Sequence, residues 1–140
     1  MMISTRGRYA LRVMVNLAQH DQTAFTPLKE LAEAEEISLK YLESIMTVLS
    51  KAGLVEGVHG KGGGYRLVKA AENYSVGEIL RVTEGSLAPT ACVESGGCPK
   101  IDRCKTYPLW QKLDREINGF LDGISLSELM TPDAGNNYVI

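Results

Sequence analysis

The sequence predicts a mainly α-helical fold with one small β-hairpin. Apolar residues recur at intervals of three and four along several segments, which is the pattern of amphipathic helices. A glycine-rich stretch between two short apolar runs is typical of a hairpin. The 140 residues are 44% hydrophobic and 23% charged, which is ordinary for a folded protein and argues against disorder. We therefore expect one domain, or one domain with an appendage.

The first predicted helix covers residues 5–19. Its apolar residues Ala10, Val13, Met14 and Leu17 follow the spacing i, i+3, i+4, i+7, so they form a single face. We expect this face to be buried.

A short second helix is expected over residues 27–35. Thr26 is the predicted N-cap and Pro27 the first helical residue, because threonine caps helices and proline suits the first helical position.

The third predicted helix covers residues 39–52. Ser38 is its predicted N-cap, and Ile37 can pack onto Leu42 as a hydrophobic staple. Gly53 suits the left-handed position that ends a helix. The residues predicted to be buried on this helix are Leu42, Ile45, Met46 and Leu49. Two helices joined by so tight a turn form a helix-turn-helix.

A hairpin with a mobile tip is predicted next, within “LVEGVHGKGGGYRLV”. A helix-turn-helix followed by a hairpin is a winged helix-turn-helix domain. A phosphate-binding loop is the rival interpretation of the glycines, but it fits poorly. Gly62 follows Lys61 where a Walker motif needs Ser or Thr, and Tyr65 stands where a dinucleotide motif needs its third glycine.

The second half of the chain predicts three further helices. Two capping boxes, Ser75 to Glu78 and Ser125 to Glu128, begin short helices. Between them, residues 108–121 carry a long apolar stripe. Its members are Trp110, Leu113, Ile117, Phe120 and Leu121.

Charge and hydropathy narrow the function classes only slightly. The net charge of −2 gives no indication of nucleic acid, although residues 1–70 hold nine basic and seven acidic residues. No apolar run approaches the ~20 residues of a membrane helix, and Asn16 interrupts the first apolar run before it resembles a signal sequence. A cytoplasmic protein is therefore expected.

The exposed face of the 39–52 helix carries side chains suited to DNA. Its first turn would enter a major groove, and its free N–H groups attract phosphate. Ser38, Lys40 and Tyr41 can contact phosphates or base edges, whereas Glu43 can accept a hydrogen bond from cytosine N4. Ser44, Thr47 and Lys51 share this predicted face. For an isolated helix the alternative is a solvated face; the adjoining hairpin favours DNA.

The hairpin tip and the first helix offer further basic groups. His59, Lys61 and Arg66 are predicted at the tip, where a thin basic hairpin suits a minor groove or a line of phosphates. Three arginines begin the first helix and are expected either to contact phosphate or to be solvated: Arg6, Arg8 and Arg12.

All three cysteines, Cys92, Cys98 and Cys104, lie six residues apart in “ACVESGGCPKIDRC”. In a reducing cytosol such a cluster indicates a metal or redox site rather than disulfides. On a helix, successive members would point about 240° apart, so we expect a flexible loop that Gly96 and Gly97 help to bend.

The thiols limit the kinds of metal that the cysteine segment can hold. Thiolates select iron–sulfur clusters, zinc or copper(I). A closed zinc site requires a fourth Cys or His ligand nearby, but His20 and His59 lie in other predicted elements. A metal-free thiol switch and ordinary reduced cysteines remain alternatives.

Three segments, “STRGRYALRVMVNLA”, “ISLKYLESIMTVLSKAGLV” and “GKGGGYRL”, resemble the IscR/NsrR/CymR (Rrf-two) family of bacterial winged-helix transcription regulators. The resemblance extends from about residue 2 to about residue 130. It implies a homodimer in which the 108–121 helix packs against the partner, while two recognition helices read an inverted repeat in double-stranded DNA. The organisation expected is a DNA-binding domain over 1–85, a cysteine loop over 86–107, a dimerisation helix and C-terminal helix over 108–130, and a tail over 131–140.

The cysteine segment also resembles the cluster-binding loop of the family's iron–sulfur sensors. This resemblance implies that Cys92, Cys98 and Cys104 bind an iron–sulfur cluster, either [2Fe-2S] or [4Fe-4S]. The fourth ligand does not carry over. Tyr107 stands where close relatives have a histidine, and Arg8 stands where the nitric-oxide-sensing branch has an acidic residue. The candidates left are Glu94, Asp102, Tyr107, a small molecule or a group of the partner subunit.

The sequence thus predicts a dimeric DNA-binding transcriptional regulator that senses cluster, redox or nitric oxide status. Two alternatives stay open: a metal-free regulator that responds to thiol state or to a partner, and a small iron–sulfur electron carrier. Enzymatic activity is not expected, because no Ser/His/acid set or carboxylate pair has a recognisable context.

Overall fold

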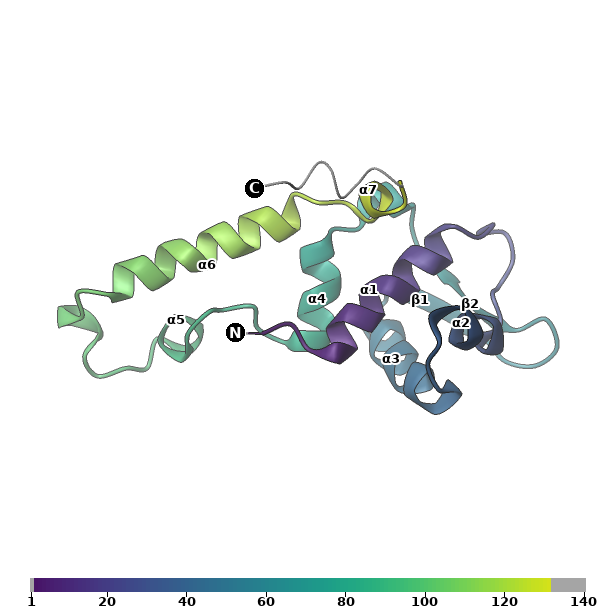
Figure 1. Cartoon of the computed structure of the whole chain (residues 1–140), viewed down its shortest axis with the longest axis horizontal. Helices are drawn as coiled ribbons and strands as arrows, with labels where there is room; N and C mark the ends of the chain where they lie inside the picture. The colour runs from purple at the N-terminus through teal and green to yellow at the C-terminus, as the bar shows by residue number, and fades with distance from the viewer. Residues whose placement is uncertain (1, 132–140) are drawn as a thin grey trace.

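The computed structural model describes residues 2–131 and consists of helices with one two-stranded hairpin. The predicted fold class is confirmed. The elements are α1 Thr5–Ala18, α2 Leu28–Glu35, α3 Leu39–Lys51, β1 Val55–Val58, β2 Gly64–Leu67, η1 Ala71–Asn73, α4 Val76–Glu84, α5 Ala91–Ser95, η2 Ile101–Arg103, α6 Tyr107–Asp122 and α7 Leu126–Leu129. Helices α1 to α4 and the hairpin form a body, from which α6 extends with α5 beside its outer part (Figure 1). Almost all of the predicted tail lies outside the described residues.

The main core lies between α1, α3 and the elements around them. One side of this core is the predicted face of α1, whose residues Ala10, Val13, Met14 and Leu17 are fully buried. The other side is the apolar stripe of α3, whose four predicted members are also fully buried. Full burial of each large aliphatic side chain contributes about 1.5–3 kcal/mol relative to exposure, so these two faces contribute strongly to the core that α1 and α3 share.

The start of α2 differs from the prediction. Thr26 is not its N-cap; Pro27 holds that position, with no side-chain cap, and the helix begins at Leu28. Thr26 instead pairs with Tyr65 of β2, through N–H to O bonds of 2.8 and 2.9 Å. The bridge holds Thr26 against a strand residue 39 positions further along the chain, and the first N–H groups of α2 receive no side-chain cap.

Both ends of α3 follow the predicted local rules. The Ser38 hydroxyl accepts a hydrogen bond from the Tyr41 N–H at 3.1 Å, which caps the helix. Gly53, just after the helix, has φ of +77°, which is the left-handed conformation predicted for a glycine at this position. The turn from α2 is made by Glu36, whose φ of +55° is unusual for a residue with a side chain.

The hairpin is antiparallel, with Val55 opposite Leu67 and Gly57 opposite Tyr65. Its base is fixed by Tyr74, which is buried. The Tyr74 hydroxyl donates to the Leu54 carbonyl at 2.7 Å and accepts from the N–H groups that follow β2. The β1–β2 hairpin, residues 55–67, is called the wing below, and it leaves the body from a rigid base.

The two predicted capping boxes have different outcomes. Ser125 and Glu128 form a complete box at the start of α7. Ser75 caps α4 by accepting from the Glu78 N–H, but the reciprocal bond is missing from the described contacts. The Glu78 carboxylate instead pairs with Lys69 at 3.1 Å, so a competing ion pair explains the incomplete box.

A second, smaller core joins α4 to α6 and α7. It consists of Val76, Leu80, Leu87 and Ile124, with Ile117 and Leu121 of α6 packed against it. Other apolar residues of α6 face solvent in this chain: Leu109 is 55% exposed, Leu113 39% and Phe120 49%. No helix within residues 2–131 has both the length and the apolar character that crossing a membrane requires.

Candidate nucleic-acid interface and cysteine segment

Lys40 and Glu43 are predicted reading residues whose charged side chains are exposed on α3. Both lie near the start of the helix, and no ion pair within residues 2–131 engages either side chain. Ser38 is also exposed, but its hydroxyl caps the helix. The Thr47 hydroxyl donates to the Glu43 carbonyl at 2.8 Å. The charged groups are therefore the ones best placed to meet a new partner.

Tyr41 does not lie fully opposite the core, which corrects the predicted face. Its ring is half-buried, packs against the main core and meets Tyr9 of α1 edge to face, with ring centroids 6.1 Å apart. Ser44 lies beside it, donating to the Tyr41 carbonyl at 2.7 Å and accepting from Arg6 at 3.3 Å. These contacts position α3 against α1.

The three arginines of α1 have three different environments. Arg12 is exposed, but its guanidinium is already paired within the protein. It pairs with the largely covered Glu35 carboxylate at 2.9 Å and lies over the Tyr9 ring. Arg6 bonds to Ser44, as described above. Arg8 is exposed and contacts only Thr5 of its own helix among the described side-chain bonds, so it remains a candidate phosphate contact.

The wing tip carries His59 and Lys61, both exposed. Gly60 and Gly62 have φ of +92° and +76°, values that side chains rarely permit, so the tip must be glycine-rich to turn as it does. Arg66 does not lie at the tip, contrary to the prediction. It lies in β2, pairs with Glu56 across the hairpin at 2.7 Å and covers the Phe25 ring.

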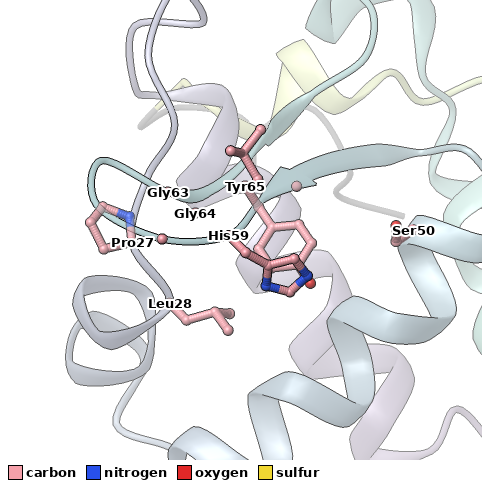
Figure 2. Close-up of a pocket in the computed structure, with 10 residues that line it drawn as sticks. Pro27, Leu28, Ser50, His59, Gly63, Gly64 and Tyr65 are labelled. Atoms are coloured by element: carbon pink, nitrogen blue, oxygen red, sulfur yellow. The ribbon is translucent and has the colours of Figure 1, made fainter.

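A cavity of about 310 Å³ lies between the wing and the helix-turn-helix. Figure 2 shows the His59 and Tyr65 rings over it, with Pro27 and Leu28 of the α2 start on one side and Ser50 of α3 on the other. The wing and both helices of the pair thus share one concave surface. A side chain at Gly64 would collide with the Thr26 carbonyl, so close contact fixes the wing beside α2.

The cysteine segment contains more regular structure than the predicted loop. Cys92 lies in the short helix α5 and is half-buried, with its sulfur 3.1 Å from the Thr90 hydroxyl. Cys98 is exposed in the following loop. Cys104 lies just after η2, 3.4 Å from the Thr106 hydroxyl. All three are free thiols.

Hydrogen bonding lowers the pKa of one of these thiols. The Thr106 hydroxyl lowers the pKa of Cys104, and the N–H groups of Thr106 and Tyr107 lower it further by stabilising the thiolate. Within residues 2–131, no three His, Cys, Asp or Glu side chains are close enough to hold a metal ion. Three free thiols on one segment fit a thiolate-bound cluster in donor chemistry, but their sulfur atoms do not converge on one point in this structure.

Helix α4 is hydrogen-bonded both to α6 and to the start of α1. Near its end, Arg81 donates to both carboxylate oxygens of Asp122 on α6, at 2.8 and 2.9 Å, and to Asn118 at 2.7 Å. At its last residue, Glu84 accepts two bonds from Ser4, the N-cap of α1. Sequence reasoning missed Arg81 and Glu84, because partners 41 and 80 residues away leave no local pattern.

The comparisons with known proteins agree with this architecture. The profile of the Rrf2 family, described as an iron-dependent transcriptional regulator, matches residues 3–132. The chain is 41% identical over 130 residues to the HTH-type transcriptional regulator IscR of Klebsiella pneumoniae, covering 93% of this chain and 80% of that protein. It is 43% identical to IscR of Aliivibrio salmonicida, covering 93% and 77%.

Two solved structures resemble the fold as a whole. CymR, the global cysteine regulator of B. subtilis, aligns with a TM-score of 0.76 at 33% identity, over 93% of this chain and 96% of that one. The T. potens IscR structure aligns with a TM-score of 0.76 at 36% identity, over 100% and 93%. From the profile match and these relatives, the chain belongs to the Rrf2 family of transcriptional regulators.

Proposed function

We propose that this regulator acts as a homodimer that binds an inverted-repeat operator in double-stranded DNA and responds to an iron–sulfur cluster. The observations that carry the DNA part are the exposed Lys40 and Glu43 near the start of α3, and the exposed His59 and Lys61 on the wing. The wing borders the start of α2 and the Ser50 end of α3. A regulator of this kind works where the chromosome is, which is the reason to place it in the cytoplasm.

The two elements would divide the contacts between them. The first turn of α3 meets base edges in the major groove, where Lys40 can donate to guanine and Glu43 can accept from cytosine N4. The wing, with Lys61 and His59 on a thin glycine backbone, follows the neighbouring phosphates or the minor groove. Ser38 and Arg8 support the phosphate contacts, and Tyr41 supports α3 through its packing against Tyr9.

The exposed apolar residues of α6 support the dimer. Leu109, Leu113 and Phe120 share one side of a helix that extends away from the body (Figure 1). A face of this kind gains stability when a second copy covers it, because burial removes its apolar area from water. A twofold dimer presents two α3 helices, which matches an inverted repeat.

The three cysteines are the proposed cluster ligands. Cys92, Cys98 and Cys104 supply soft thiolate donors on one segment, and the family profile is described as iron-dependent. When bound, the cluster would supply a redox-sensitive group whose loss or oxidation alters the segment that holds it. Glu94, Asp102, Tyr107, a small molecule and a partner group remain the candidates for the fourth position.

The state of the cysteine segment would reach the DNA-binding surface through α4. The segment follows α4 directly, at Gly85, and packs beside α6. Because α4 is bonded to α6 by Arg81 and to the start of α1 by Glu84, a rearranged segment favours a different placement of the winged helices. Ligation would thereby change which half-site spacing fits the dimer.

A metal-free thiol sensor is the second candidate function. It is favoured by the free thiols, which are not gathered in this structure, and by the lowered pKa of Cys104. Anaerobic purification distinguishes the two: a coloured protein with matched iron and sulfide supports the cluster, and a colourless one supports the thiol sensor.

Selection from a random duplex library tests the DNA-binding proposal. We expect the purified protein to enrich a two-part inverted repeat. Enrichment of no sequence, with binding equal on all duplexes, would refute sequence-specific DNA recognition.

A further inference from the structure

We propose that Leu39 reads the C5-methyl group of a thymine in each operator half-site, an inference that rests on the proposed DNA binding. Leu39 is the first residue of α3 and is 46% exposed. The large apolar residues further along the same helix, Leu42, Ile45, Met46 and Leu49, are completely buried. The core therefore accounts for the rest of the apolar stripe but not for its first member.

The polar neighbours of Leu39 are mostly engaged within the protein. Ser38 caps the helix, Ser44 bonds to the Tyr41 carbonyl and to Arg6, and Thr47 bonds to the Glu43 carbonyl. What remains exposed near the start of α3 is one cation, one carboxylate and one large apolar side chain. A reading surface of this composition needs an apolar feature on the DNA to match Leu39.

Leu39 is also placed beside a side chain that we propose reads a base. Leu39 and Glu43 are four residues apart, so they lie on the same edge of α3, one turn from each other. Helical side chains lean toward the N-terminus, which carries Leu39 further toward the end of the helix that enters the groove. If Glu43 meets one base pair, Leu39 therefore lies over an adjacent part of the site.

The major groove offers only one apolar group on its base edges, the C5-methyl of thymine. Contact with that methyl removes apolar area of both partners from water. A buried methyl-sized group is worth roughly 0.8 kcal/mol, which corresponds to about a fourfold change in affinity. Leu39 cannot form hydrogen bonds to any other base edge, so thymine is the base that its chemistry favours.

The test is a uracil scan of the selected operator. Each thymine of one half-site is replaced singly by deoxyuridine, which keeps every hydrogen-bonding group and removes only the methyl. We expect one position to weaken binding of the unchanged protein by about fourfold, and the other positions to have little effect.

Two variants assign that effect to Leu39. Leu39→Ala should bind the thymine and uracil operators equally, and Leu39→Met should restore the preference because it keeps an apolar side chain of similar reach. Val68→Ala is the matched control, since Val68 is 51% exposed but lies outside α3; it should keep the full preference. Circular dichroism confirms that each variant is folded.

The proposal is overturned if no thymine position responds to uracil, or if Leu39→Ala keeps the response. These results leave the DNA-binding function intact, because the operator would still be bound with sequence preference. Failure of the library selection itself would instead refute the proposed function and this inference with it.

Discussion

The Glu84 carboxylate accepts two hydrogen bonds from Ser4, one from its hydroxyl at 2.6 Å and one from its N–H at 3.0 Å. The same Ser4 hydroxyl accepts from the Gly7 N–H and so caps α1. The Glu84 carboxylate lies so close to Gly7 that a Cβ there would displace it. The last residue of α4 thus fixes the first turn of α1, immediately before the chain turns at Gly85 into the cysteine segment.

Removing the Glu84–Ser4 contact should weaken the coupling between the cysteine segment and the winged helix-turn-helix. We expect Glu84→Ala to lower the free energy of unfolding by about 1 kcal/mol, because Ser4 loses its hydrogen-bond acceptor. We also expect it to reduce the difference in operator affinity between cluster-loaded and metal-free protein. Urea denaturation and fluorescence anisotropy measure the two effects.

The matched control for Glu84 is Glu72→Ala, which removes an exposed carboxylate from η1. It should leave both quantities unchanged. If Glu84→Ala destabilises the protein but leaves the difference in DNA affinity at its original value, Glu84 is a structural contact only and does not transmit the state of the cysteine segment.

The Arg81–Asp122 pair should contribute modestly to stability. In a double-mutant cycle of Arg81→Ala and Asp122→Asn, we expect a coupling energy of about 0.5–1 kcal/mol, since the pair is bidentate but more than a third exposed. The more telling readout is half-site spacing. We expect Asp122→Asn to accept operators with one base pair added or removed more readily than the unchanged protein; an unaltered spacing preference would contradict a role in fixing α6.

Lys61 and Glu43 should affect DNA binding in different ways. Lys61→Ala should weaken binding to operator and to random duplex alike, and reduce the slope of log K against log salt by about one. Glu43→Ala should instead change which bases the library selection enriches. Lys112→Ala, which removes an exposed cation from α6, is the control for charge. Equal effects of both variants on operator and random DNA would refute these separate roles.

The apolar face of α6 should hold the dimer together. Leu113→Glu should shift the protein toward the monomer in sedimentation experiments, because it places a charge among the exposed Leu109 and Phe120 side chains. Arg115→Glu introduces the same charge on another side of the helix and should leave the dimer intact. An unchanged dimer in Leu113→Glu would place the interface elsewhere.

Each cysteine should be required for cluster binding. Cys92→Ala, Cys98→Ala and Cys104→Ala should each lose most of the iron and sulfide found after anaerobic preparation, because a cluster held by fewer thiolates is more easily lost. Ser95→Ala lies in the same segment and should retain both. If a single cysteine variant kept its full iron and sulfide, that residue would not be a ligand.

Local chemistry predicted much of this fold. Helix α3 begins at the Ser38 hydroxyl cap and ends before Gly53, which lacks a side chain and adopts positive φ, as predicted. The buried face of α1 follows from its periodicity alone. In each case the determining partner lies within a few residues. Helix caps and amphipathic helix faces can therefore be predicted from the sequence before any tertiary contact is known.

The errors arose where a distant partner competed with a local one. Thr26 pairs with Tyr65 instead of capping α2, and Arg66 pairs with Glu56 instead of reaching the wing tip. Glu78 bonds to Lys69 in place of its own N-cap. The bonds from Arg81 to α6 and from Glu84 to α1 could not be predicted at all, since they depend on how the helices pack.

The most direct test of DNA reading by the wing and α3 is a salt titration of the unchanged protein on its selected operator and on a scrambled duplex. We expect operator affinity to fall steeply with salt, with a slope near −0.9 for each phosphate neutralised, while the operator stays the tighter ligand at every salt concentration. A flat salt response, or equal affinity for the two duplexes, would contradict the account.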